Sequence, residues 1–454
     1  MNSITRRILI GGALSLAALL ALVTPPIANA ATIHVPTDQP TIQAAINAAS
    51  NGDTVQVALG TYMENINFNG KAITVTSTGG PQVTTINGGG NGPVATFSTS
   101  EGLTSVLNGF TLTNGIGTNY SGGGVYIAGA SPTITGNVIT GNSVCASGSG
   151  IYAQSSSANL QGNTISNNNT SRCSGGHGGG IYLDGGSVQV LNNTIADNNT
   201  DTGGGGISLY GAQGTIQNNL ISGNTTGDQG GGIELMNGSN PGMVQNVIVG
   251  NTAPSGGGIW MQEWPMAFVN NTIANNTSSD GSAIYVFYSN GPMTFYNNIM
   301  TGPAGVSVVW CPGGSNYVLP TFNSNDVYNS GGTPFAGGCA DPTGTNGNIS
   351  ADPLFFDPSN NNFHILVGSP VIDMGNNSAP DLPSTDFDSN PRIQNGTVDM
   401  GAYEFFPTTA TVSPSSLSFV SVAYGATSPS QAVTVTNTGS NPLLFDIVVT
   451  GDFG

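Results

Sequence analysis

Hydrophobic positions along the chain follow two superimposed periods. On the short scale, apolar and polar residues alternate over runs of a few residues, which is the pattern of a β-strand with one face buried. On the long scale, a glycine-rich step followed by an aliphatic residue returns seven times, and a second apolar residue follows two positions later. The aliphatic residues after the seven steps are Val125, Ile151, Ile181, Ile207, Ile233, Ile259 and Ile284.

The spacing between successive steps is 26, 30, 26, 26, 26 and 25 residues. This regularity predicts the stacked turns of a solenoid and not a globular core. Because no helix-length periodic run interrupts the repeat, we expect each turn to contain about three short strands with glycine and asparagine at the corners.

Asparagine recurs at two further positions of the repeat. Stacked turns place like residues above one another at about 4.8 Å, so side-chain amides can bond along the stack. We therefore predict that the asparagine columns are structural and do not serve glycosylation or metal binding. The first column contains Asn137, Asn163, Asn193, Asn219, Asn246, Asn271 and Asn298. The second contains Asn142, Asn168, Asn198, Asn224, Asn251 and Asn276.

If the aliphatic residues point inward, the residue after each points outward. The resulting column contains Tyr126, Tyr152, Tyr182, Ser208, Glu234, Trp260 and Tyr285. Two positions later the same face shows Ala128, Gln154, Asp184, Tyr210, Met236, Gln262 and Phe287.

These columns predict a long apolar stripe edged with amide and carboxylate groups, on which sugar rings stack while their hydroxyls bond to the polar edge. The alternative is that aromatic residues suit exposed strands and pack on one another up the stack. The candidate glycan-binding residues are Tyr126, Tyr152, Tyr182, Tyr210, Trp260 and Tyr285.

Two carboxylates on this face, Asp184 and Glu234, are the candidate catalytic residues of an enzymatic alternative. They lie two turns apart, which places their backbones about 11 Å from each other. Inverting glycosidases hold their carboxyl groups about 6.5–9.5 Å apart, so inward-leaning side chains are needed. His177 stands in a Gly-His-Gly sequence, but its counterparts in other repeats are Ser121 and Ser255, which indicates a chance match.

The first thirty residues predict a signal peptide. Arg6 and Arg7 precede an apolar run over residues 8–23, and Ala28-Asn29-Ala30 has the small-x-small pattern of a cleavage site. We expect cleavage near Ala30 and a secreted, extracellular or cell-surface protein; the export route stays open. No other apolar segment approaches the roughly 20 residues of a membrane span, so none is expected after the signal is removed.

Charge narrows the choice of partner. After residue 30, 23 acidic residues face only three cations, Lys71, Arg172 and Arg392, which gives a formal charge of −20. Nucleic acid and anionic lipid bind mainly through Lys and Arg, so neither is an expected partner. Polyanionic sugars meet the same repulsion.

The four cysteines form an even set, as expected of an exported chain. We favour pairing Cys145 with Cys173 and Cys311 with Cys339, because each pair is separated by 28 residues, about one repeat. The other two connectivities and free buried thiols stay open.

The segment before the repeats predicts a short helix. Residues 41–50 place Ile42, Ala45, Ile46 and Ala49 on one face. The open end of a solenoid exposes apolar side chains and strand edges, so we expect this helix to cap the first turn.

The glycine steps and asparagine strands, over about residues 33–300, resemble the right-handed parallel β-helix of the pectin-lyase-like superfamily. They are also similar to the repeats of bacterial polymorphic outer-membrane adhesins. The resemblance implies right-handedness, but one fold hosts many functions. Lyases of this superfamily use a calcium cluster with an Arg or Lys base, and polygalacturonases use a paired Asp-Asp; the chain has no Asp-Asp pair and shows no basic cluster.

Two later segments resemble other modules. Residues 351–355, 368–373 and 399–404 are similar to the choice-of-anchor Q module of bacterial surface proteins. Residues 408–454 resemble the first half of an immunoglobulin-like domain of the abnormal-spindle and hydin type, too short to close a sandwich.

The sequence thus predicts an all-β protein in four parts. They are a signal peptide (1–30), a capped right-handed parallel β-helix (31–300), closing coils with the choice-of-anchor Q type module (301–406) and a partial β-sandwich (407–454). The leading functional hypothesis is a monomeric surface protein that binds polysaccharide or surface glycan without catalysis. The alternatives are a polysaccharide lyase or glycoside hydrolase and a structural spacer. No cofactor is expected; calcium binding stays open, although the chain has no spaced ligand motif for it.

Overall fold

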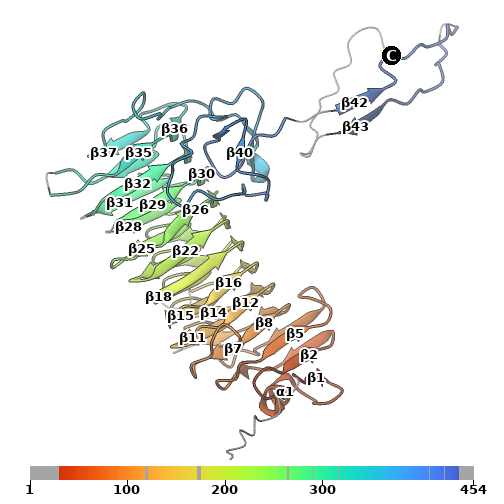
Figure 1. Cartoon of the computed structure of the whole chain (residues 1–454), viewed down its shortest axis with the longest axis vertical. Coiled ribbons are helices and arrows are strands. Elements are labelled where there is room, and N and C mark those ends of the chain that lie inside the picture. Colours follow the sequence, from red (N-terminus) through yellow and green to blue (C-terminus); the bar gives the residue numbers. More distant parts are fainter. Residues whose placement is uncertain are drawn as a thin grey trace, which may run out of the picture.

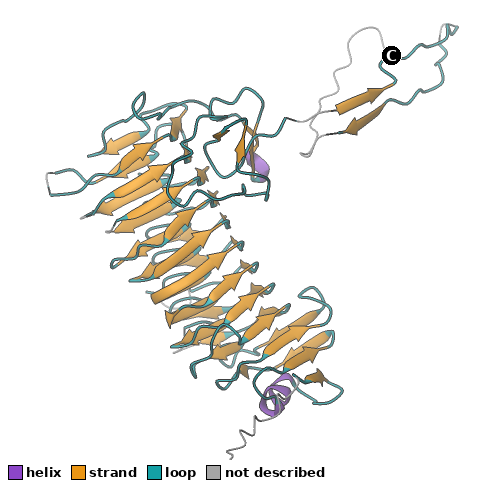
Figure 2. Cartoon of the chain, in the orientation of Figure 1, coloured by secondary structure: helices purple, strands orange, loops and turns teal. Residues whose placement is uncertain are grey.

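The computed structural model describes residues 30–117, 121–170, 175–262, 265–289, 291–314, 316–407, 410–423 and 425–438. In these residues the chain forms a parallel β-solenoid with very little helix, and its turns stack along one axis (Figures 1 and 2). The predicted signal peptide lies outside the described residues except for Ala30. No described helix has both the length and the apolar character that a membrane span requires.

Three faces of parallel strands run along the stack. The first face contains β4 (Ile66–Asn67), β7 (Ala95–Phe97), β11 (Val125–Ala128), β15 (Ile151–Ser156), the start of β18 (Ile181–Leu191), β21 (Ile207–Tyr210), β25 (Ile233–Met236), β28 (Ile259–Gln262), β31 (Ile284–Tyr288), β34 (Val309–Cys311) and β37 (Phe335–Gly337). The second face contains β1 (Thr32–Val35), β2 (Thr54–Val57), β5 (Thr74–Ser77), β8 (Val106–Asn108), β12 (Thr133–Thr135), β16 (Asn159–Gln161), the end of β18, β22 (Gln213–Gln217), β26 (Gly242–Val244), β29 (Met266–Val269), β32 (Met293–Tyr296) and β35 (Thr321–Asn323).

The third face is an 11-stranded sheet. It contains β3 (Gly60–Met63), β6 (Thr84–Asn87), β9 (Thr111–Thr113), β13 (Val138–Thr140), β17 (Thr164–Ser166), β19 (Thr194–Ala196), β23 (Leu220–Ser222), β27 (Val247–Val249), β30 (Thr272–Ala274), β33 (Ile299–Gly302) and β36 (Asp326–Asn329). Two short parallel pairs lie beyond it, β10 (Ile116–Gly117) with β14 (Ser143–Val144) and β20 (Asn199–Thr200) with β24 (Thr225–Thr226).

The predicted register is confirmed. Ile151 pairs with Ile181, Ile181 with Ile207, and Ile207 with Ile233. All of these side chains are fully buried, so the inside of the solenoid is a continuous aliphatic column. Such a column removes apolar surface from water at every turn and is the main source of stability.

The asparagine columns are buried hydrogen-bonded ladders, as predicted. Nδ2 of Asn163 donates to Oδ1 of Asn193 at 3.1 Å, and Nδ2 of Asn168 donates to Oδ1 of Asn198 at 3.0 Å. Each amide also bonds to backbone of a neighbouring turn, as when Asn198 Nδ2 donates to the carbonyl of Ile165 at 2.9 Å. The two ladders bracket each strand of the third face between β13 and β30, and they fix its corners.

The predicted N-terminal helix is present as α1 (Ile42–Ala48), with Ile42, Ala45 and Ile46 buried. Glu64 accepts hydrogen bonds from the backbone N–H groups of Ile42 and Gln43, both at 2.9 Å. Nζ of Lys71 donates to three carbonyl oxygens at the other end of α1, each at 2.7 Å. The two charges match the helix dipole, because anions favour the N-terminus and cations the C-terminus.

The stacked turns continue past residue 300, beyond the end of the β-helix predicted over residues 31–300 and into the segment predicted to contain closing coils. Tyr285 pairs with Trp310, and Trp310 with Ala336. These turns lack the glycine step that marked the earlier ones, so the sequence pattern missed them. Cys311 and Cys339 form a disulfide here, as predicted. Cys145 is also disulfide-bonded, and its predicted partner Cys173 lies outside the described residues.

After the last turn the chain folds back over the third face. This module contains β38 (Phe355–Asp357), η1 (Pro358–Asn360), β39 (Asn362–Ile365), β40 (Ile393–Gln394) and β41 (Thr397–Val398). Phe363, Ala402 and Tyr403 pack on Val247 and Val249 of β27. Arg392 is buried at the centre of the module, with Nη1 3.5 Å from Oε1 of Glu404.

A separate antiparallel pair follows, β42 (Ala410–Ser413) with β43 (Thr434–Asn437), and it lies apart from the stack (Figure 1). Residues 439–454, which belong to the predicted partial sandwich, lie outside the described residues.

Candidate functional site

The first face carries the predicted aromatic column in the predicted register. Tyr126 pairs with Tyr152, Tyr152 with Tyr182, and Trp260 with Tyr285. Trp310 extends the column by one turn. Sequence reasoning missed Trp310, although the alternation of Val309, Trp310 and Cys311 was a signal for an outward residue between two inward ones.

The three tyrosines at the start of the column form a stack. The rings of Tyr126 and Tyr152 lie 5.5 Å apart and 5° from parallel, and those of Tyr152 and Tyr182 lie 5.6 Å apart and 11° from parallel. All three side chains are half-buried. Because each inner ring face is covered by the next ring, the stack presents mainly ring edges and hydroxyl groups to a ligand.

A polar edge accompanies this stack. Nε2 of Gln154 donates to Oδ2 of Asp184 at 2.7 Å, and the hydroxyl of Tyr152 lies 3.5 Å from the same oxygen. Burial and the charge of Asp184 raise the pKa of Tyr152 to about 12. The same two causes raise the pKa of Tyr182. Both phenols therefore remain neutral hydrogen-bond donors at physiological pH.

Farther along, the column is covered, which corrects the expectation of an exposed stripe. Trp260 is only 4% exposed and packs on Phe287, with ring centroids 5.3 Å apart. Tyr285 stacks on Trp310 at 4.3 Å. Tyr210 and Phe287 are exposed, at 43% and 52%. The candidate sugar-binding aromatics thus separate into the half-buried tyrosine stack and a partly closed cluster around Trp260.

Glu234 and Ser208 are also buried, although their column was predicted to face outward. The cause is the loop before each glycine step, which folds over the side chain. A Cβ atom on Gly203 would lie 1.9 Å from Oε1 of Glu234, so the carboxylate occupies the space that a glycine leaves. The two-residue alternation of a strand does not indicate where a loop folds or how far a side chain extends, so it could not predict this burial.

Three side chains donate to the buried carboxylate of Glu234. Ser208 Oγ lies 2.7 Å from Oε2, Gln229 Nε2 lies 2.8 Å from Oε1, and His177 Nδ1 lies 3.0 Å from Oε2. Sequence reasoning treated His177 as a chance motif and missed this contact. The loop column that holds His177 and Gln229, four residues before each aliphatic anchor, was the available signal.

The Glu234 carboxylate controls the titration of His177. Burial lowers the pKa of His177, but the hydrogen bond and charge of Glu234, together with the charge of Asp228, outweigh burial and raise it above 6.5. Since a carboxylate only accepts, Nδ1 must carry the proton, and Nε2 is left for solvent or ligand. The His177 side chain is 29% exposed and its ring lies 6.3 Å from that of Tyr182.

The proposed catalytic pair is not brought together by direct contacts. Asp184 is bonded to Gln154, whereas Glu234 is enclosed by His177, Ser208 and Gln229. A carboxylate enclosed in this way orients its neighbours and has no open path to a substrate. Among the described residues, no group of three or more His, Cys, Asp or Glu side chains is placed to hold a metal ion.

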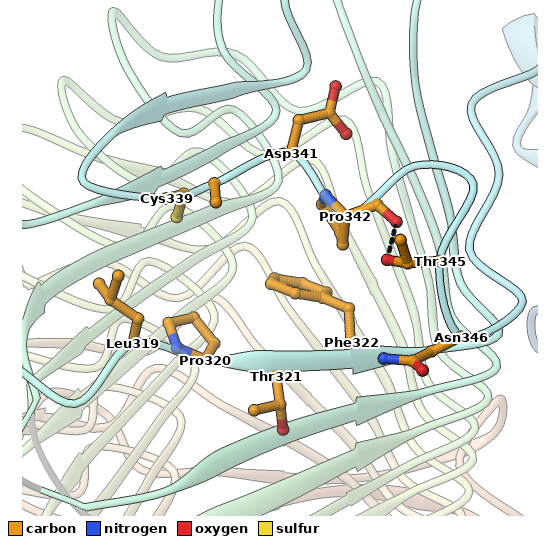
Figure 3. A pocket seen from close by; sticks show the side chains of 10 residues that line it. Leu319, Pro320, Thr321, Phe322, Cys339, Asp341, Pro342, Thr345 and Asn346 are labelled. Atoms are coloured by element: carbon orange, nitrogen blue, oxygen red, sulfur yellow. Dashed lines mark hydrogen bonds between the residues drawn. The ribbon is translucent and has the colours of Figure 1, made fainter.

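A cavity of about 350 Å³ lies at the far end of the stack (Figure 3). Phe322 of β35 forms its floor, and Leu319, Pro320 and Pro342 line it. Thr345 donates a hydrogen bond to the carbonyl of Pro342 in the loop that borders it. The cavity lies well away from the tyrosine stack along the chain, and its lining carries one carboxylate, Asp341.

Comparison with known protein families gives one match. The family model described as a right handed beta helix region matches residues 61–263 and 170–320. Together the matches span residues 61–320, more than half of the 454 residues. No curated protein and no solved structure matches the chain.

Proposed function

Because the chain belongs to the right-handed β-helix family, we propose that it is an exported, surface-associated protein that binds a polysaccharide along its first face without cleaving it. The observation that carries this proposal is the stack of Tyr126, Tyr152 and Tyr182 beside the Asp184–Gln154 pair. Aromatic edges and convergent hydrogen-bonding groups on a rigid scaffold are what carbohydrate recognition uses.

Tyr182 is the ring best placed to stack on a sugar. Its partner in the next turn is Ser208, whose small side chain leaves the second face of the Tyr182 ring without a stacked aromatic neighbour. The imidazole of His177 and the carboxylate of Asp184 flank this position and offer groups that bond to hydroxyls. A sugar ring here packs against the part of the half-buried Tyr182 ring that stays exposed.

Charge favours a neutral polysaccharide. The mature chain carries a formal charge of −20, and the residues beside the stack are acidic or uncharged. A polyuronate is repelled by this field, whereas a neutral glucan or mannan is not.

The other modules fit the same role as proposals. We propose that α1 caps the first turn of the β-helix. We further propose that the segment that resembles the choice-of-anchor Q module and the start of the immunoglobulin-like domain attach the β-helix to a cell surface. A structural spacer requires the same modules but no sugar-binding face.

The test is retention in affinity gel electrophoresis through neutral and acidic polysaccharides. We expect the full chain to be retarded by a neutral polymer, and the Tyr182→Ala variant to lose most of that retardation, since one aromatic contact is worth about 0.5–1.5 kcal/mol beyond its buried area. The matched control is Tyr296→Ala, on the second face. Equal retardation of both variants and the parent would contradict the proposal.

An assay of the same protein and polysaccharide samples for cleavage distinguishes the enzymatic alternative from binding alone. Release of new reducing ends during the assay indicates a hydrolase or lyase and turns attention to Asp184 and Glu234. Binding without product supports the non-catalytic proposal, and neither binding nor product favours a spacer.

A further inference from the structure

One position of the repeat fills the interior of the solenoid beneath the second face. It lies three residues before each asparagine of the first ladder, and its side chain is apolar and buried in every turn from β12 to β35. These residues are Ile134, Leu160, Val190, Ile216, Met243, Phe268, Phe295 and Phe322. The last three form a stack of rings, with centroids 4.5 Å apart between Phe268 and Phe295 and 5.0 Å apart between Phe295 and Phe322.

The asparagine ladder continues for one turn beyond this stack of rings. Nδ2 of Asn325 donates to Oδ1 of Asn348 at 3.1 Å, so the turn after Phe322 keeps the register of the earlier ones. The residue three positions before Asn348 is Thr345, which is exposed. Its backbone N–H and its hydroxyl both donate to the carbonyl of Pro342, at 3.0 and 2.6 Å, so the chain makes a tight turn here. The ladder therefore continues, but the chain places no large apolar side chain over Phe322.

The cavity at the far end of the stack lies at this position. Its volume is about 350 Å³, Phe322 is its floor, and Thr345 belongs to its lining (Figure 3). Phe295 covers one face of the Phe322 ring. Phe335 meets the same ring edge-on, at 80° between the planes, and does not extend the parallel stack. The cavity thus offers an aromatic floor between the apolar walls that Leu319, Pro320 and Pro342 provide.

The floor and the opposite wall are both tied to the stacked turns. Cys339 lines the cavity and is joined to Cys311 of β34 by the disulfide. Nδ2 of Asn348 donates to the carbonyl of Phe322 at 2.9 Å and to that of Thr345 at 2.8 Å. These bonds hold the cavity open in the free protein, and small-molecule sites are usually pre-formed in this way.

From this arrangement we propose that the cavity binds a small planar aromatic molecule that carries no negative charge and stacks on Phe322. Parallel, offset packing on an aromatic floor favours a planar ring over a saturated one. An apolar cavity of about 150 Å³ is large enough for benzene, so one of about 350 Å³ admits two fused rings. Among the described lining residues none is a Lys, Arg or His and one is a carboxylate, Asp341, which disfavours an anionic ligand.

The experiment is a calorimetric titration of the full chain with three probes that share one carbon skeleton. They are naphthol, its saturated analogue decahydronaphthol and its carboxylate analogue naphthoate. We expect naphthol to bind at one site, about three- to tenfold more tightly than decahydronaphthol, because only the planar ring stacks. Naphthoate binds more weakly than naphthol. In methyl-resolved NMR spectra, naphthol shifts the methyl signals of Leu319, which locates the bound ring in the cavity.

Three variants test the position of the ring, and circular dichroism shows whether each is folded. Thr345→Phe supplies a ring from the chain itself and abolishes naphthol binding. Ser350→Phe is the matched control, because it adds the same ring at an exposed residue outside the lining, and it retains binding. Phe322→Leu keeps an apolar floor without a ring, so its affinities for naphthol and decahydronaphthol become about equal. This last comparison decides the matter if Thr345→Phe does not fold.

Four results would overturn the proposal. They are a folded parent protein that does not bind naphthol, naphthol binding that leaves the Leu319 methyl signals in place, a folded Thr345→Phe that binds naphthol as the parent does, and an unchanged preference for naphthol in Phe322→Leu.

This inference does not depend on polysaccharide binding by the first face. Tyr182→Ala retains naphthol binding, and Thr345→Phe retains polysaccharide retardation. The two proposals therefore fail separately.

Discussion

His177 and Glu234, which are two turns and 57 residues apart, are hydrogen-bonded to each other, with Nδ1 of the imidazole 3.0 Å from Oε2 of the carboxylate. The contact joins the loop before β18 to the outward side of β25. It exists because the intervening turn carries Gly203 where a side chain would block the path. A buried carboxylate and a partly exposed imidazole make the stability of these turns depend on pH.

The first prediction concerns this pH dependence. The pKa of His177 is raised above its ordinary value of 6.5, so the protonated ring stabilises the folded state. The contribution is complete below about pH 6.5 and is lost as the pH rises through the raised value. We expect the melting temperature of the parent to fall relative to that of His177→Gln between about pH 6 and pH 9. If the difference in melting temperature between the two proteins stays constant across this range, the protonation of His177 does not stabilise the fold.

Gly203→Ala tests the space that the carboxylate occupies. The added Cβ meets Oε1 of Glu234 at 1.9 Å, so either the carboxylate or the loop must move. Overpacking of this kind costs about 1–3 kcal/mol in the free energy of unfolding. Gly102→Ala is the matched control, because nothing lies within 4 Å of its added Cβ. Chemical denaturation of both variants measures the difference in the free energy of unfolding. Equal stabilities would show that the loop and the Glu234 carboxylate move apart without cost.

The buried asparagine ladder predicts that Asn198→Ala lowers the free energy of unfolding more than Gly203→Ala does. Its Nδ2 donates to the carbonyl of Ile165 and to Oδ1 of Asn224, and its Oδ1 accepts from the backbone and side chain of Asn168. Asn198→Ala leaves these buried partners unsatisfied and costs about 2–5 kcal/mol. Asn199→Ala, at the exposed neighbouring position, changes the unfolding free energy by less than about 1 kcal/mol. A comparable loss in both variants would refute the assignment.

We expect a substitution of Lys71 to destabilise the N-terminal helix α1 locally. Lys71→Met keeps the aliphatic stem but removes the three hydrogen bonds to the carbonyls of Ile46, Asn47 and Ala49. We expect α1 to lose about 1–3 kcal/mol of local stability, because charge-assisted bonds to the helix end are removed. Hydrogen exchange of the α1 amides then speeds up while the amides of β18 keep their rates. Unchanged exchange in α1 would count against a role of Lys71 in holding it.

Asp326 gives a prediction with the opposite sign of pH dependence to an ordinary paired carboxylate. It is fully buried in β36, and its Oδ2 has no hydrogen-bond partner. Burial raises its pKa to about 7. The unfolded chain releases this proton near pH 3.8, so the folded state is progressively destabilised as the pH rises from there toward 7.

Asp326→Asn removes that penalty. In the parent, the backbone N–H of Ala351 donates to Oδ1 of Asp326 at 3.0 Å, and the asparagine side chain keeps an oxygen that accepts this bond. The variant is expected to be more stable than the parent near pH 8 and about equal near pH 4, by thermal melting at both values. A constant difference between the two proteins would show that ionisation of Asp326 is not involved.

The solenoid and its inner columns followed from the sequence because they depend on period alone. Ile151 and Ile181 stack since both follow a glycine step, and Asn163 meets Asn193 for the same reason. The turn that carries Trp310 was missed because it has no glycine step, although it pairs in register with Tyr285. A sequence repeat does not reveal a turn that keeps the geometry of the solenoid but lacks the glycine step by which the other turns were recognised.

The candidate site was predictable only in part. The register of Tyr126, Tyr152 and Tyr182 was correct, but the exposure of Glu234 and Trp260 was wrong. The alternation of a strand says which side of the sheet a residue takes. It does not say whether a loop from an adjacent turn covers that side.

The sequence by itself determined the stacking, the aliphatic interior, the asparagine ladders and the order of residues on each face, because in a solenoid these are set by local repeats and nearest-neighbour turns. Only the tertiary structure decided which outward residues meet solvent. Glu234 is enclosed because its side chain reaches past Gly203 to His177, two turns away. Val247 and Val249 are covered because the chain folds back over them from more than a hundred residues later. Both results depend on side-chain reach and on docking between distant segments, which no repeat length encodes.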